Sequence, residues 1–155
     1  MATNEQKKIA LADFLDIEPS ELSIDEERNT FSTGTCEWLV LTDEEADKKT
    51  REEIEGILWT FNPDFILKEC NLIKEMDGPT LHSVNESLRS IQEKCCESCN
   101  DFFKGLIKGT CGLDKFVQDA ISADGRGHFL AYYDSREHFH EYFRSGEDFY
   151  IYQIN

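Results

Sequence analysis

The stretch Asn29–Asp47, NTFSTGTCEWLVLTDEEAD, decides the fold, because a hairpin signal is followed there directly by a helix start. Gly34 separates the first apolar residues of the stretch from the run Trp38–Leu41, and a glycine turn between two such segments predicts a β-hairpin. Thr42 is a favoured N-cap residue, and Glu45 follows three residues later, as in a capping box. The stretch therefore predicts strand, turn, strand and helix in succession.

Outward from this stretch, apolar periodicity and helix-start signals predict further helices. The predicted helices cover residues 5–16, 43–61, 63–77 and 83–108, with a short one that Asp114 caps. The segment ADGRG (123–127) predicts a turn, and DGP (77–79) predicts a helix end. The aromatic segments HFLAYYD (128–134) and DFYIYQIN (148–155) predict two strands, joined by a long connection, SREHFHEYFRSGE (135–147).

These elements predict an α+β fold in a single domain over residues 1–155. Four or five helices should pack with a small antiparallel sheet, which the N-terminal hairpin and two C-terminal strands would form. The chain of 155 residues suits one core, and eleven Phe, five Tyr and two Trp supply the apolar area of a folded protein. Because neither an apolar run of membrane length nor a secretory signal is present in the sequence, we expect a cytoplasmic protein with reduced cysteines.

Negative charge is concentrated near the N-terminus. Thirty-two Asp and Glu against sixteen Lys and Arg give a net charge of −16. Between Ile9 and Asp47, twelve acidic residues face one basic residue, Arg28, which leaves −11 in a quarter of the chain. Such a surface repels nucleic acids and anionic membranes and attracts basic clefts, whereas the plainer interpretation is an ordinary soluble surface. The candidate partner-binding residues are Asp13, Asp16, Glu18, Glu21, Asp25, Glu26, Glu27, Asp43, Glu44 and Asp47.

Three cysteines lie close together in EKCCESCNDFF (93–103). On a helical wheel they fall within one broad apolar arc, so they could pack inside as small hydrophobic residues. Alternatively, the Cys-x-x-Cys spacing could contribute to one structural zinc site. The ligands would be Cys96, Cys99, His138 and His140, with Cys70, Cys111 and His128 as substitutes. A redox centre is disfavoured, because Glu93 and Glu97 would raise the thiol pKa values.

The segment DGRGHFLAYYD (124–134) also gathers polar residues around two glycines. Asp124, Arg126, His128 and Asp134 could form a phosphate-binding or acid–base cluster, or could merely surround a glycine turn. The sequence contains no phosphate-binding loop, dinucleotide fingerprint or hydrolase motif. We therefore do not expect an enzyme.

Three parts of the chain resemble small acidic proteins of bacteriophages and mobile elements. They are EWLVLTDEEAD (37–47), ILWTFNPDFI (57–66), and ADGRGHFLAYYD with FYIYQIN within 123–155. The resemblance implies a phage context, and by analogy it implies inhibitors of host nucleic-acid enzymes, such as anti-CRISPR and anti-restriction proteins and the uracil-DNA glycosylase inhibitor.

The resulting hypothesis is a non-enzymatic inhibitor without a cofactor, apart from the zinc alternative. Its carboxylates would imitate DNA phosphates on a basic, nucleic-acid-handling surface of a host defence nuclease. A CRISPR effector is the first choice and a restriction enzyme the second. Two alternatives stay open. One is a small metal-dependent hydrolase or nucleotide-processing enzyme that uses Asp124 and the histidines, and the other is an adaptor whose protein binding is insensitive to salt.

Overall fold

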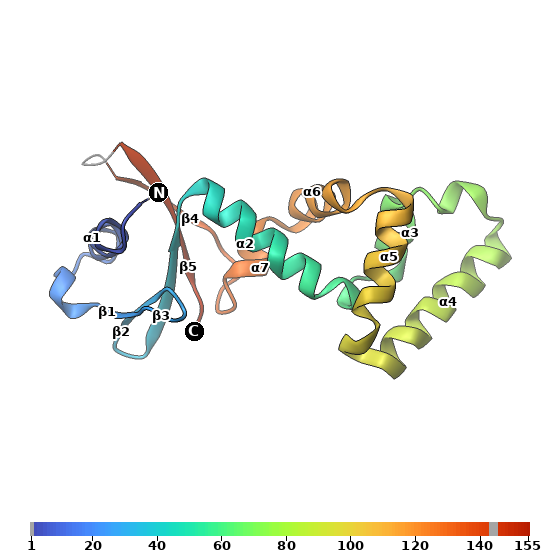
Figure 1. Ribbon diagram of the computed structural model, residues 1–155, viewed down its shortest axis with the longest axis horizontal. Helices are drawn as coiled ribbons and strands as arrows, with labels where there is room; N and C mark the ends of the chain where they lie inside the picture. The colour runs from blue at the N-terminus through green and yellow to red at the C-terminus, as the bar shows by residue number, and fades with distance from the viewer. Residues whose placement is uncertain (1, 143–145) are drawn as a thin grey trace. The chain divides into compact units, whose positions relative to one another are not determined.

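A computed structural model of the protein describes residues 2–142 and 146–155 and confirms the α+β class (Figure 1). Its residue contacts group into two compact units. Residues 1–50 and 124–155 form the first, which we call the sheet unit, and residues 51–123 form the second, which we call the helical unit. The boundaries fall within helix α2 and near the end of helix α6, and each unit is described by itself.

The sheet unit contains five antiparallel strands in the order β1-β2-β3-β5-β4. They are β1 (Ser23–Asp25), β2 (Thr30–Thr33), β3 (Cys36–Leu41), β4 (His138–Tyr142) and β5 (Glu147–Gln153). The predicted hairpin is β2–β3, with Gly34 at a φ of 59° in its turn. Strand β3 then pairs with β5, so that Val40 faces Ile151 in the register. Strand β1 was not predicted from the sequence, because it has only three residues.

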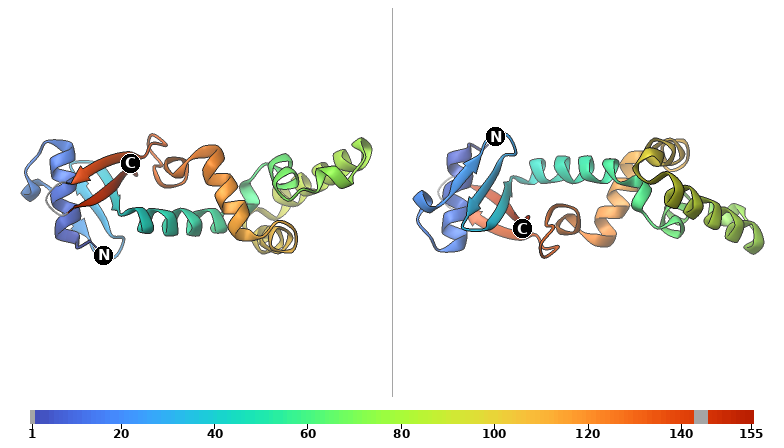
Figure 2. Two further views of the ribbon diagram at one scale, coloured as in Figure 1. Left: turned by 90° about the horizontal axis from the view of Figure 1, so that it is seen from above. Right: turned by 90° about the horizontal axis from the view of Figure 1, so that it is seen from below.

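Alternating side chains of the central strands build two apolar layers, one on each face of the sheet. Helix α1 (Asn4–Leu15) covers one face, where Leu11 packs in a buried cluster with Val40 and Phe149. Both views in Figure 2 show α1 lying against the strands. On the other face, Tyr152 belongs to a cluster with Ala46 of helix α2 (Asp43–Gly56). Leu130 and Ala131, at the end of helix α7 (Arg126–Leu130), join the same cluster.

The helical unit consists of helices that pack around several phenylalanine side chains. Its elements are η2 (Leu58–Thr60), α3 (Pro63–Glu69), η3 (Ile73–Glu75), α4 (Gly78–Cys95), η4 (Cys96–Cys99), α5 (Asn100–Thr110) and α6 (Leu113–Asp124). The ring of Phe116 lies edge-on to Phe61 and Phe65, with centroids 5.3 and 5.6 Å apart. Asn100 connects the start of α5 to residues 55–59, since its side chain accepts from the Trp59 amide and donates to the Glu55 carbonyl.

One of the two predicted C-terminal strands was placed on the wrong segment. HFLAYYD (128–134) forms most of α7 and a turn, whereas the strand is HFHEY, inside the predicted connection. Phe129, Leu130 and Ala131 are buried, and Leu130 and Ala131 pack against one face of the sheet, in the cluster of Tyr152, instead of joining it as a strand. In β4, by contrast, His138 and His140 alternate with Phe139, and both imidazoles contact the ring of Phe14.

The predicted helix over residues 83–108 is in fact two helices. Backbone torsions at Cys96 (φ 48°, ψ −135°) end α4, and η4 leads into α5. The continuous apolar arc is therefore interrupted: Cys99 is buried, but Cys95 and Cys96 are exposed. The segment at 77–79 begins α4 instead of ending a helix, because the Asp77 side chain accepts from the Thr80 amide as an N-cap.

Candidate protein-binding surface

The N-terminus of α2 is fixed by the capping box that the sequence predicts. The Thr42 amide donates to Glu45 Oε2 at 2.9 Å, and the Glu45 amide donates to Thr42 Oγ1 at 3.4 Å. Lys7 of α1 adds a partner that sequence reasoning missed, with its Nζ 2.6 Å from the same Glu45 oxygen and its side chain only 2% exposed. Burial alone would raise the pKa of Glu45, but hydrogen bonds from Lys7 and Thr42 and the attraction of Lys7 lower it overall.

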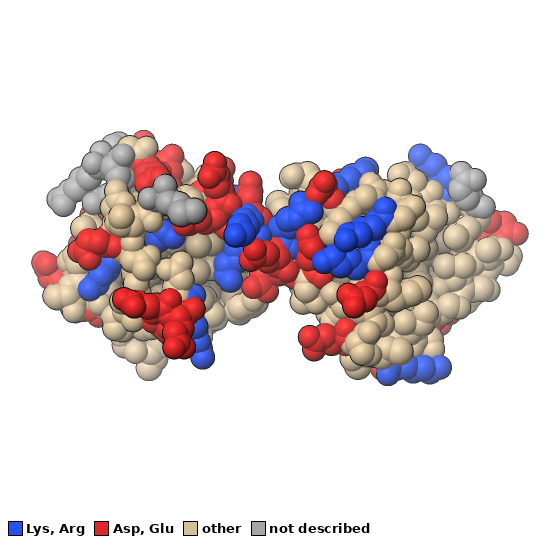
Figure 3. Space-filling model, in the orientation of Figure 1, with Lys and Arg blue, Asp and Glu red and all other residues tan. Residues whose placement is uncertain are grey.

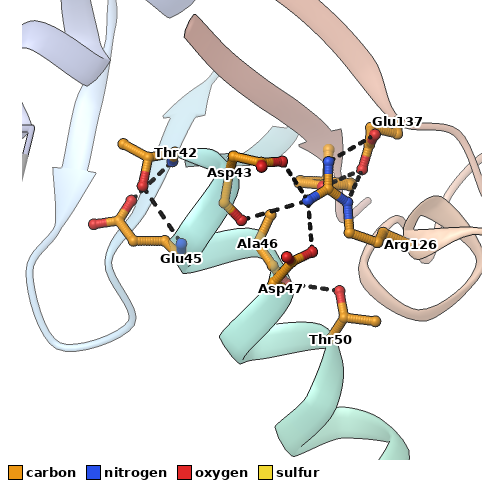
Figure 4. A network of polar contacts seen from close by, with 9 residues as sticks. Thr42, Asp43, Glu45, Ala46, Asp47, Thr50, Arg126 and Glu137 are labelled. Carbon is orange, nitrogen blue, oxygen red and sulfur yellow. Dashed lines mark hydrogen bonds and ion pairs between the residues drawn. The ribbon is translucent and has the colours of Figure 1, made fainter. Parts of the chain in front are cut away.

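Arg126, the first residue of α7, is the centre of a larger ionic network (Figure 4). Its guanidinium reaches Asp43 Oδ1 at 2.7 Å and Asp47 Oδ1 at 2.8 Å, one turn apart on α2. On its other side it donates to both Glu137 oxygens, at 2.8 and 3.0 Å. One cation therefore joins three carboxylates from two segments of the sheet unit, and the local charge stays negative.

Two tyrosines of β5 complete this network. The Arg126 guanidinium carbon lies 4.4 Å from the centroid of the Tyr150 ring, a cation–π contact. The hydroxyl of Tyr152 donates to Glu137. Burial, and then the hydrogen bond to Glu137, raise the pKa of Tyr152, so that this hydroxyl keeps its proton at neutral pH. Burial opposes the charge of Arg126, but its hydrogen bonds to Glu137 and Asp43 raise the guanidinium pKa.

Gly127 explains how Arg126 and Glu137 come together. A β-carbon at position 127 would lie 2.6 Å from the Glu137 nitrogen and 2.8 Å from the Ser135 oxygen. Only glycine allows this approach of two backbone segments. The preceding Gly125 has a φ of 77°, which lets the chain turn from α6 into α7. The two glycines of DGRG therefore position Arg126.

The Arg126 network holds Asp43 and Asp47 at the surface without burying them. Their side chains are 67% and 65% exposed, although that of Arg126 is only 11% exposed. Next to them, Glu44 has no basic partner among the described residues. The start of α2 therefore presents three carboxylates at the surface, two of which, Asp43 and Asp47, are held in place by Arg126.

The acidic run before the hairpin lies at the surface of the same unit. Of the ten candidate partner-binding residues, nine are exposed and Asp25 is half-buried. Asp25 has a structural role, because its Oδ1 accepts from the backbone amides of Glu27 and Arg28 and so closes the β1–β2 turn. Within residues 2–142 and 146–155, Glu26 and Glu27 form no ion pair. Figure 3 shows carboxylates over the β1–β2 end of the sheet and over the start of α2.

The sheet unit carries most of the net charge. Its eight Lys and Arg against nineteen Asp and Glu give −11, whereas eight against thirteen leave the helical unit at −5. The structure thus keeps the predicted acidic segments in one unit and adds the carboxylates of β4 and β5 to them.

A pocket of about 640 Å³ opens beside the N-terminus of α2. Among the described residues that line it, five are acidic and Lys48 is the one basic residue. The lining residues are Thr42, Asp43, Glu44, Glu45, Lys48, Gly146, Glu147, Asp148 and Tyr150. A pocket with this lining suits a cationic side chain better than an anionic one, because its carboxylates would repel a phosphate.

The four residues predicted as zinc ligands are divided between the units. Cys96 and Cys99 belong to the helical unit, where the Cys99 thiol donates to the Cys96 carbonyl at 2.9 Å. His138 and His140 belong to the sheet unit and lie 3.2 Å from Asp134 and Asp13. In the described part of the chain, no group of three or more His, Cys, Asp or Glu is arranged to hold a metal. The zinc site stays a prediction.

The second sequence-predicted cluster has mostly separate roles. Asp124 and His128 are exposed, Asp134 pairs with His138, and Arg126 belongs to the network with α2. Within the described part of the chain, these four residues do not come together in one acid–base site.

Comparison with protein-family models, with curated proteins and with solved structures finds no match to this chain. Within the described ranges, no helix is both long and apolar enough to cross a bilayer.

Proposed function

We propose that this protein is a non-enzymatic inhibitor whose sheet unit docks on a basic surface of a nucleic-acid-handling enzyme. A host defence nuclease, first a CRISPR effector and next a restriction enzyme, is the target class that we favour. The observation that supports it most is the concentration of exposed carboxylates on the sheet unit, several of them without a basic partner among the described residues.

The physical reason is competition for a groove that is already built for phosphates. Lys and Arg side chains of such a groove gain charge-assisted hydrogen bonds from carboxylates as they do from DNA. Asp43 and Asp47 are well suited to this role, since the Arg126 network orders them in advance and reduces the entropy that binding would cost. Binding should therefore exclude DNA from the enzyme and weaken as salt screens the charges.

The test is DNA binding and cleavage by purified, guide-loaded CRISPR effectors and by restriction enzymes, each with and without this protein. We expect loss of DNA binding at stoichiometric protein for at least one enzyme. Full DNA binding and cleavage by every enzyme of both classes, at protein concentrations well above that of the enzyme, would contradict the proposal.

A matched pair of variants locates the surface. Glu26→Lys/Glu27→Lys reverses two exposed charges of the sheet unit, and Glu93→Lys/Glu97→Lys reverses two exposed charges of the helical unit. Both variants change the net charge from −16 to −12. We expect the first to weaken inhibition at least about tenfold, because like charges then meet across the interface. The second should inhibit within about twofold of the wild type. Equal effects would show that net charge alone matters.

A further inference from the structure

Two thiols that are distant in the sequence meet in the helical unit. Cys70 follows the last residue of α3, and Cys111 follows the last residue of α5. Their sulfur atoms lie 3.4 Å apart, although 41 positions separate the two residues. In the described part of the chain, no other two thiols are in hydrogen-bond contact.

The two sulfurs differ in their access to solvent. Cys70 is buried, whereas Cys111 is half-exposed. The pKa of the Cys70 thiol is raised to about 11, and burial is the largest cause. A hydrogen bond with Thr110 lowers this pKa in part, whereas the neighbouring Cys111 raises it further. Cys70 is therefore protonated at neutral pH and shielded, so a reagent in solution meets Cys111 first.

The separation is short enough for a covalent bond. Disulfide sulfurs lie about 2.05 Å apart, so the two sulfurs need to approach by roughly 1.4 Å for a bond to form. The cysteines of α4 and η4 are arranged differently. Cys95 and Cys96 are exposed neighbours in the chain, and the Cys99 thiol is engaged with a backbone carbonyl.

We propose that Cys70 and Cys111 are a reversible disulfide site, oxidised by low-molecular-weight disulfides such as oxidised glutathione. In the first step the Cys111 thiolate attacks one glutathione sulfur, so that a mixed disulfide forms and one glutathione thiolate leaves. In the second step the Cys70 thiol loses its proton to solvent and its sulfur attacks the Cys111 sulfur, which releases the second glutathione. Two protein thiols are oxidised, and one glutathione disulfide is reduced to two glutathione thiols.

The bond would join the C-terminal ends of α3 and α5. This redox proposal goes beyond the proposed inhibitor function and does not rest on it, because neither cysteine belongs to the acidic surface.

The experiment treats the full chain with oxidised glutathione, alkylates the remaining thiols after denaturation, and maps tryptic peptides by mass spectrometry. The pair lies on two separate peptides, 69–74 and 109–115, whereas Cys95, Cys96 and Cys99 share the peptide 95–104. We expect 69–74 linked to 109–115, with loss of the link after dithiothreitol. Persistent separate alkylation of these two peptides at a glutathione ratio that already oxidises peptide 95–104 would overturn the proposal.

Single variants test the order of the two steps. Cys70→Ser should accumulate glutathione on Cys111, because no second thiol resolves the mixed disulfide. Cys111→Ser should leave Cys70 unmodified, and Cys96→Ser, the control, should still give the linked peptides. Should circular dichroism show that Cys70→Ser is unfolded, Cys70→Ala replaces it. Glutathione on Cys70 in folded Cys111→Ser, or a lasting adduct on Cys111 in the wild type, would contradict the mechanism.

Discussion

Replacing Arg126 by Met tests whether the ionic network holds the sheet unit together. The change keeps an apolar chain beside Tyr150 but removes every hydrogen bond to the three carboxylates. The bonds to Asp43 and Asp47 should count for little, because these two side chains are 67% and 65% exposed. Glu137 is only 28% exposed, and hydrogen bonds to charged groups contribute about 1.5–3 kcal/mol.

The expected loss is therefore about 2–3 kcal/mol of unfolding free energy, or a fall in melting temperature of roughly 4–12 °C. The chain offers a convenient assay, because its two tryptophans lie in different units, Trp38 in β3 and Trp59 in the helical unit. In a Trp59→Phe background, urea unfolding followed by fluorescence reports on the sheet unit through Trp38 alone.

Arg28→Met is the matched control. Arg28 also lies between two carboxylates of the sheet unit, but at 3.8 Å from Asp25 and 4.0 Å from Glu37, and with its side chain 72% exposed. Removing it should cost less than about 0.5 kcal/mol. If Arg126→Met and Arg28→Met shift the urea midpoint equally, the Arg126 network does not have the structural role that its geometry indicates.

Two further predictions concern backbone packing and pH. Gly127→Ala should destabilise the protein by about 1–3 kcal/mol, because the added β-carbon meets the backbone of residues 135–137. The control, Gly105→Ala, lies in open space on α5 and should stabilise the protein by up to about 1 kcal/mol. Equal urea midpoints for the two variants would refute the close approach of the two backbone segments. Glu45→Gln should cost about 2 kcal/mol at pH 7. Since Lys7 helps to hold the pKa of Glu45 below 4.5 in the folded state, that difference should shrink as the pH falls from about 4.5 through the lowered pKa. A difference constant from pH 7 to pH 3 in urea titrations would contradict the ion pair.

Elements with local signals were predictable from the sequence. The hairpin around Gly34 and the capping box of Thr42 and Glu45 depend on residues only a few positions apart. The strand assigned to residues 128–134 was wrong because its aromatic composition favours a strand, whereas the segment packs against the face of the sheet, with Leu130 and Ala131 in the cluster of Tyr152. The interruption at Cys96 is a backbone conformation that the side-chain pattern on a helical wheel does not register.

The candidate surface was predictable in part, because the exposure of charged residues is also a local property of the sequence. Exposure of the acidic run follows from its charge, because isolated carboxylates are seldom buried. The partners of Arg126 did not follow, since Asp43 and Asp47 stand 83 and 79 positions away in the chain. The spacing of Gly125 and Gly127 was the available signal, and it indicated a turn without showing which segment would approach it.

The central claim is that the carboxylates of the sheet unit occupy a phosphate-binding groove of the target. The most direct measurement is the dissociation constant for an inhibited nuclease as a function of salt, with and without duplex DNA. We predict that the affinity of this protein for the nuclease falls steeply from 50 to 200 mM salt and that duplex DNA competes for the same site. Glu26→Lys/Glu27→Lys should make the affinity less dependent on salt, whereas Glu93→Lys/Glu97→Lys should leave the salt dependence unchanged. Binding that is indifferent to salt, or simultaneous binding of DNA and this protein, would contradict the central claim.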